Sequence, residues 1–65
     1  KMTTHYSYAC KDYPGMEACP GLVVAETESE VWQLMELHAK VAHEEDPAQW
    51  NDEDRAQLKT LIKAE

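Results

Sequence analysis

The chain has 65 residues, of which 13 are acidic and six are basic, so its formal net charge is -7. A chain this short forms one domain at most and buries only about 60% of the surface that its unfolded form exposes, so we expect a covalent, metal or oligomeric contact to supplement a small core. No stretch concentrates lysine and arginine, which argues against a nucleic-acid partner, and no apolar run approaches the roughly 18 residues of a membrane span, which argues against insertion.

The first third of the sequence is typical of a β-hairpin. Residues 5–10, HYSYAC, alternate with the period of a half-buried strand, which places both tyrosines and Cys10 on the same side. Pro14-Gly15 suits the central positions of a type II turn, because proline presets its backbone angle and glycine tolerates a positive one. The β-branched residues of LVVAE, residues 22–26, predict a second short strand, and a further bend is expected at Pro20-Gly21.

The middle of the sequence predicts one amphipathic helix from about Glu28 to His43. TESE, residues 27–30, supplies the threonine and the glutamate of a capping box directly before the apolar pattern. Proline disfavours helical backbone at the residue before it, so Pro47 places the end of this element at residues 44–46. With about 100° of rotation per residue, the inward face of the helix is predicted to hold Val31, Leu34, Met35, His38 and Ala42.

Residues 47–65 are predicted to form a helical extension of a hairpin–helix domain that covers residues 1–46. Asn51 can cap a second helix at residues 52–64, DEDRAQLKTLIKA. The narrow apolar stripe of this helix, together with Trp50, is expected to pack on the domain or on a partner. The stripe consists of Leu58, Leu61 and Ile62. The predicted fold class is therefore α+β, with a β-hairpin packed on an amphipathic helix and a short second helix at the C-terminus.

Four potential metal donors follow the pattern Cys10-x8-Cys19-x18-His38-x4-His43. The thiols lie on the predicted hairpin and the imidazoles on the predicted helix, which is the order of a small zinc-finger-like ββα unit. Tetrahedral zinc takes two thiolates and two neutral imidazoles, and the thiolate charges balance that of the metal. We therefore expect one Zn²⁺ per chain at these donors. The spacer of eight residues between the cysteines and the spacer of 18 residues between Cys19 and His38 both differ from the commonest zinc-finger values. The pattern is therefore only moderately specific.

The step from His38 to His43 is wider than the step that aligns two side chains on a helix. It turns about 140° and rises about 7.5 Å, so either the last turn loosens or the two imidazoles converge from opposite sides of the helix. His38 falls on the predicted inward face, and His43 falls at its edge. On this basis we expect replacement of His38 to abolish the fold and replacement of His43 only to weaken the site.

Two other interpretations of these residues stay open from the sequence. Cys10 and Cys19 can form a disulfide across the hairpin, although the cytoplasmic location that we expect from an N-terminus without an apolar signal-peptide core disfavours it. Alternatively the four side chains are unconnected, with His38 an ordinary buried histidine. His5 is a weaker candidate donor because it points to the opposite face of its strand from Cys10. The acidic residues 44–46 are expected to be solvated surface.

Taken together, these residues resemble a family of short bacterial and archaeal proteins of unknown function that are described as predicted small metal-binding proteins. The resemblance spans about Tyr8 to His43. It rests on YAC with Asp12 and Gly15, on Cys19, on the helix start AETESEV and on HAKVAH. It implies a hairpin-plus-helix fold and places the family's metal ligands on Cys10, Cys19, His38 and His43. It names no reaction or partner, and residues 44–65 lie outside the matched part.

Two functions follow from these interpretations. The first is a small zinc-binding protein whose structural metal supports a surface for another protein. The alternative is a protein that buffers or delivers zinc through an exchangeable site. Four protein donors leave no position for an activated water, so we do not expect an enzyme. A thiol–disulfide redox protein is a third and weaker hypothesis, because the cysteines lack the C-x-x-C spacing.

We expect no specific binding to duplex DNA, because a net charge of -7 repels phosphate and no basic patch offsets it. The measurement is a titration with micromolar DNA near physiological ionic strength. A salt-sensitive shift in that titration would contradict the expectation.

Overall fold

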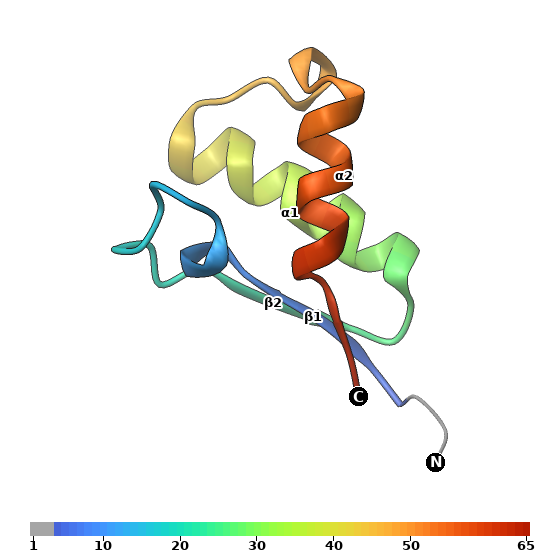
Figure 1. The fold of residues 1–65 in the computed structure, drawn as a ribbon. Helices are drawn as coiled ribbons and strands as arrows, with labels where there is room; N and C mark the ends of the chain where they lie inside the picture. The colour runs from blue at the N-terminus through green and yellow to red at the C-terminus, as the bar shows by residue number, and fades with distance from the viewer. Residues whose placement is uncertain (1–3) are drawn as a thin grey trace.

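The structure, a computed structural model, describes residues 4–65 (Figure 1). Within that range an antiparallel sheet has the strand order β2-β1-β3, and helix α1 follows the β1–β2 hairpin directly. The elements in chain order are β1 (Tyr6–Ala9), the 3-10 helix η1 (Cys10–Asp12), β2 (Leu22–Ala25), α1 (Glu28–His43), the 3-10 helix η2 (Pro47–Gln49), α2 (Asp52–Leu61) and β3 (Lys63–Ala64). The predicted α+β class with a ββα unit is confirmed.

The hairpin of β1 and β2 forms from the alternation and the turn that the sequence predicts. Tyr8 pairs with Val23 in the antiparallel register and is buried, so one side of the hairpin faces the core. In the connecting loop the Met16 amide donates to the Tyr13 carbonyl at 3.0 Å, and Gly15 has a φ of 93°, as a type II turn requires. This loop carries both cysteines between the two strands.

Helix α1 begins and ends where local signals place its termini. The Thr27 hydroxyl accepts a hydrogen bond from the Glu30 amide at 3.2 Å, which caps the first turn. At the other end Glu44 takes a left-handed conformation, and the amides of Glu44 and Glu45 both donate to the Ala39 carbonyl. The Glu44 bond spans five residues, one more than in a regular α-helix, so the last turn is wider than the rest.

The buried face of α1 differs from the predicted one. Its buried residues are Val31, Met35 and Ala39. Leu34 and Ala42, which the wheel places inward, are exposed. Val31 and Met35 are buried as predicted, and Ala39 is buried in place of Leu34 and Ala42. The sheet covers one flank of α1 and α2 contacts the adjacent flank, so the centre of the buried face is rotated toward α2 (Figure 1).

The C-terminal residues join the sheet, which the sequence did not predict. α2 begins with a complete capping box between Asn51 and Asp54. It ends at Leu61 instead of continuing to the end of the predicted helix, because Ile62 is extended and the chain pairs with β1 as β3. The two ends of the described chain therefore lie side by side (Figure 1).

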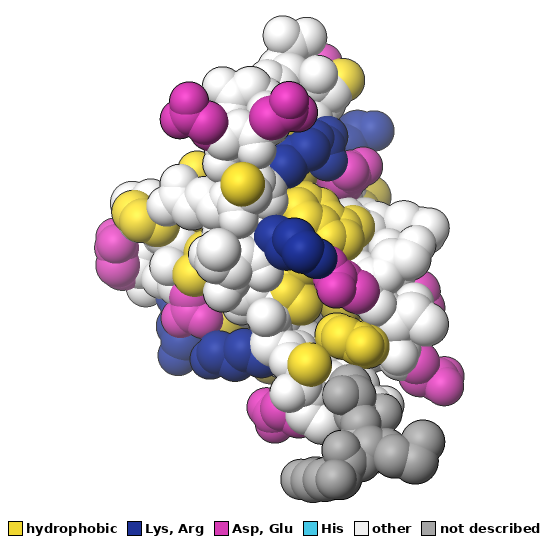
Figure 2. Space-filling view, turned by 45° about the vertical axis from the view of Figure 1, so that its right-hand side comes forward, with side chains coloured by type: hydrophobic (Ala, Val, Ile, Leu, Met, Phe, Trp, Pro, Cys, Tyr) yellow, Lys and Arg dark blue, Asp and Glu magenta, His cyan; other side chains and the backbone are white. Residues whose placement is uncertain are grey.

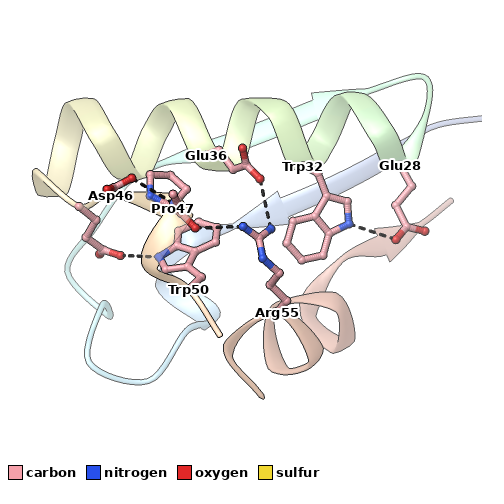
Figure 3. A network of polar contacts seen from close by, with 9 residues as sticks. Glu28, Trp32, Glu36, Asp46, Pro47, Trp50 and Arg55 are labelled. Carbon is pink, nitrogen blue, oxygen red and sulfur yellow. Dashed lines mark hydrogen bonds and ion pairs between the residues drawn. The ribbon is translucent and has the colours of Figure 1, made fainter. Parts of the chain in front are cut away.

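Arg55 joins α2 to α1 through the contacts drawn in Figure 3. Its guanidinium donates to the Glu36 carboxylate at 3.2 Å and to the Pro47 carbonyl at 2.9 Å. Its Cζ atom lies 6.0 Å from the centroid of the Trp32 ring and 5.4 Å from that of Trp50. One cation is thus held by two indoles, one from α1 and one from the segment that precedes α2.

The core is small and draws one or two residues each from β1, η1, α1 and α2. Its buried cluster consists of Tyr8, Cys10, Val31, Met35 and Leu58. Cys10 is therefore at the same time a candidate metal donor and part of the hydrophobic core. Leu58 shows that α2 contributes to the same core as the hairpin and α1.

The surface carries charges of both signs. On the face shown in Figure 2, acidic and basic side chains are interspersed and hydrophobic side chains are visible between them. Among residues 4–65, neither α-helix is long and apolar enough to cross a membrane.

Arg55→Lys should lower the free energy of unfolding by about 1–2 kcal/mol, because an ammonium cannot reproduce the fixed fork of two hydrogen bonds or stack as guanidinium does. The ion pair alone contributes less, since the two side chains are 39% and 40% exposed. Urea unfolding followed by circular dichroism measures the difference. The control is Lys59→Arg, which retains an exposed ion pair with Glu28 and should change the free energy by less than about 0.5 kcal/mol. Equal effects of the two substitutions would refute this role of Arg55.

Candidate metal centre

All four predicted donors meet where the hairpin loop contacts the C-terminal half of α1. Cys10 begins η1 directly after β1, and Cys19 lies in the turn before β2. His38 and His43 project from the last turns of α1. One donor atom from each residue lies within 4.8 Å of the donor atoms of the other three. We call this set, Cys10, Cys19, His38 and His43, the four-donor cluster.

Three of the sulfur–nitrogen distances in the cluster are close to those of a tetrahedral metal site. His38 Nε2 lies 3.4 Å from Cys19 Sγ, and His43 Nε2 lies 3.5 Å from the Sγ atoms of both Cys10 and Cys19. A tetrahedron with metal–sulfur bonds of about 2.3 Å and metal–nitrogen bonds of about 2.0–2.1 Å separates sulfur from nitrogen by about 3.6 Å. The cluster could therefore hold one metal ion with little rearrangement.

The two imidazoles reach the cluster from opposite sides of the buried face of α1. With about 100° per residue, His38 lies about 60° to one side of Met35 and His43 about 80° to the other. Their ring centroids are 5.1 Å apart and the rings are nearly perpendicular. The widened last turn and the approach from two sides together allow two histidines five residues apart to reach the same cluster.

The burial of the two histidines does not distinguish an inner one from an outer one. Both imidazoles are half-buried. The predicted difference depended on a face that includes Leu34 and Ala42, and both of these residues are exposed. The structure therefore gives no reason for replacement of His38 to be more disruptive than replacement of His43.

The two cysteines are free thiols in the structure, so the disulfide alternative is not realised. Burial raises the pKa of the Cys10 thiol to about 11, and the neighbouring Cys19 acts in the same direction, while the Tyr8 hydroxyl opposes the shift. At neutral pH Cys10 is accordingly protonated when no cation is bound. A bound cation would favour the thiolate, so metal binding at this site is coupled to proton release.

Gly21 supports three of the four donors, a role that the sequence did not reveal. Its amide donates to Cys19 Sγ at 3.4 Å, and its carbonyl accepts a hydrogen bond from the Cys10 amide at 3.0 Å. A β-carbon at this position would lie only 2.6 Å from His38 Nε2, so the imidazole occupies the space that any other residue would need. The only signal in the sequence was the position of this glycine, two residues after a donor, where we predicted merely a bend.

The weaker candidates lie outside the cluster. His5 Nε2 is 3.9 Å from the Glu65 carboxylate, at the other end of β1 from Cys10. In the acidic run, Glu45 accepts a hydrogen bond from the Trp50 indole and Asp46 caps η2. Within residues 4–65, the four-donor cluster is the one group of three or more such side chains that is arranged to hold a metal ion.

Fold and cluster together define a small α+β protein with a four-donor site that could hold a metal ion. A family model described as "Protein of unknown function (DUF1059)" matches residues 5–64, so the chain belongs to this family. The match includes the tail, which we had placed outside the part of the chain that resembles the family. No curated protein and no solved structure matches the chain.

Gly21→Ala should lower the affinity for Co²⁺ by about tenfold or more, because the new methyl group displaces the His38 ring from the cluster. The measurement is a Co²⁺ titration followed by visible absorption. Gly15→Ala is the matched control: it strains a turn with positive φ but meets no atom within 4 Å, so the affinity of the folded protein should not change. Unchanged affinity in Gly21→Ala would show that His38 is not a ligand.

His38→Ala and His43→Ala should weaken Co²⁺ binding to a similar extent, within about tenfold of each other, because both imidazoles are half-buried and each contacts a thiol. Both variants should change the visible spectrum of bound Co²⁺. His5→Ala should leave the spectrum and the affinity as they are. If only His38→Ala lost the fold, the two histidines would be unequal after all.

Proposed function

We propose that the protein binds one Zn²⁺ per chain through the four-donor cluster and that this metal has a structural role. The observation that carries the proposal is the sulfur–nitrogen spacing of 3.4–3.5 Å, which matches the edges of a tetrahedral zinc site. Two thiolates and two neutral imidazoles suit zinc better than the oxygen-preferring cations calcium and magnesium. The bound ion and the two thiolates would together be neutral.

A structural role is supported by the position of Cys10. This residue is 5% exposed and belongs to the buried cluster, so a metal at its sulfur would extend the core. A core of five clustered residues is small for a chain of 65, and small domains commonly gain their remaining stability from a metal. Binding of zinc would hold the hairpin loop against α1.

We propose a binding function and no enzymatic one, because the four positions of a tetrahedral ion would all be taken by side chains. A catalytic zinc site keeps one position for water or substrate. The reduced cysteines that such a site needs are compatible with the reducing cytoplasm, which we propose as the location of the protein.

A protein partner is supported by exposed apolar side chains on α1 and β2. Leu37 is 56% exposed and Val41 is 75% exposed, and with Leu34 they follow one flank of α1. Leu22 and Val24 are exposed on β2, which is an edge strand of the sheet. In this proposal zinc fixes the hairpin and α1 relative to each other, so that these side chains form a defined surface.

The alternative function is zinc buffering or delivery. The observation that favours it is the exposure of the donors: Cys19, His38 and His43 are all only half-buried. A competing ligand could reach a metal from that side. Whether zinc leaves slowly or rapidly therefore separates the two proposals.

Native mass spectrometry of protein purified without added metal tests the zinc site, and the expected species is the chain with one zinc ion. Addition of a strong chelator should then remove zinc slowly, with loss of helical circular dichroism as the core opens. Rapid removal with the fold intact would favour buffering or delivery. A metal-free chain that is two hydrogens light would establish a disulfide and overturn the zinc proposal.

A further inference from the structure

A cavity of about 130 Å³ lies beside the four-donor cluster. Three of the four donors line it, and Cys19 does not, so the cavity lies on the side of the cluster away from that residue. Its buried lining residues are Tyr8, Cys10, Met35, Ala39 and Leu58. The hairpin loop and the segment that connects α1 to α2 supply the sides. The cavity therefore exists only because the tail folds back over the metal centre.

The cavity has the size of a small organic group. A cavity of about 150 Å³ accommodates benzene, so a space of about 130 Å³ accepts a group of five or six non-hydrogen atoms. The lining includes apolar side chains from every side, among them Met16, Tyr13 and Trp50. An occupant with an apolar body would replace water that has few partners there.

The charged side chains of the lining are both acidic. They are Glu45, which is exposed, and Asp54, which is half-exposed, so both lie toward the opening. The Glu45 carboxylate accepts a hydrogen bond from the Trp50 indole at 3.1 Å, which orients the carboxylate and the ring relative to each other. Arg55 stacks on Trp50 and is paired with Glu36, but it does not line the cavity.

We propose that this cavity binds an alkylammonium group: the apolar body enters between the aromatic and methionine side chains, and the cation stays at Glu45 and Asp54. Carboxylates and the faces of tyrosine and tryptophan both attract an ammonium, and the lining contains no lysine or arginine to oppose it. The same group is presented by a free aliphatic amine and by a lysine side chain of a peptide. The proposal requires the folded chain but not a particular metal.

The test is a titration of the full-length, zinc-loaded chain with butylammonium chloride, followed by the indole N–H signals in ¹H–¹⁵N spectra. Trp50 lines the cavity and Trp32 does not, so the Trp50 signal should shift and saturate in the millimolar range while the Trp32 signal stays in place. The uncharged analogue 1-butanol should bind at least tenfold more weakly. Equal binding of butylammonium and 1-butanol, or no saturable shift of the Trp50 signal, would overturn the proposal.

Two conservative substitutions test the contribution of charge. In the double variant Glu45→Gln, Asp54→Asn, each amide oxygen can still accept the hydrogen bond of the carboxylate that it replaces, so the fold should persist while butylammonium binds at least tenfold more weakly. Asp52→Asn removes one charge from the same turn of α2 without touching the cavity and should have no effect. Unchanged binding in the double variant would refute the role of the carboxylates.

A comparison of two peptides identifies the source of the alkylammonium group. A short peptide with one lysine is compared with the same peptide carrying alanine at that position. Tighter binding of the lysine peptide than of butylammonium assigns the site to a protein partner, and equal or weaker binding assigns it to free amines. The zinc content of each sample is measured separately by native mass spectrometry, so a failure of the zinc proposal is distinguished from a failure to bind the ammonium group.

Discussion

The contact between the hairpin loop and the C-terminal half of α1 is the interaction on which the rest of the structure depends. Cys10 takes part in it twice, because its side chain belongs to the hydrophobic core and its sulfur belongs to the four-donor cluster. Without this contact, the loop between β1 and β2 would have few interactions with the rest of the protein. Its conformation is fixed by a succession of tight turns and by the hydrogen bond from the Cys10 amide to Gly21, which brings both thiols to the helix.

The chemistry of this contact follows from its position at the edge of the core. Burial disfavours the thiolate of Cys10, and a second thiol nearby adds to that effect. A cation bound to both sulfurs would offset this penalty, so the stability of the fold would depend on the affinity for the metal. A chain with so small a core gains more from such coupling than a larger domain would.

The tail completes the arrangement from the opposite side. Leu58 enters the core, β3 pairs with β1, and Arg55 joins α2 to α1 between two indoles (Figure 3). These contacts come from three separate places in the tail, so residues 47–65 contact both the hairpin and α1. The same packing encloses the cavity beside the four-donor cluster.

The sequence by itself determined the elements whose causes are local. Alternation predicted the two strands, the Pro14-Gly15 turn was identified from its residue types, and the Thr27 cap together with Pro47 fixed the ends of α1. The convergence of Cys10, Cys19, His38 and His43 was also predicted, because their order along the chain assigns two to a hairpin and two to a helix. The signals for the strands, the turn and the ends of α1 each lie within a few residues of the feature that they predict.

Only the tertiary structure decided the rest. The pairing of β3 with β1 joins residues at opposite ends of the chain, and that pairing ends α2 earlier than helical propensity would. The buried face of α1 is rotated relative to the predicted face because both α2 and the sheet contact the helix. A helical wheel does not include these tertiary contacts. A side chain at Gly21 would displace the His38 ring, which is distant in sequence and occupies the place of that side chain. In each case the cause is a contact between segments that are distant in sequence, so the local sequence pattern does not predict the feature.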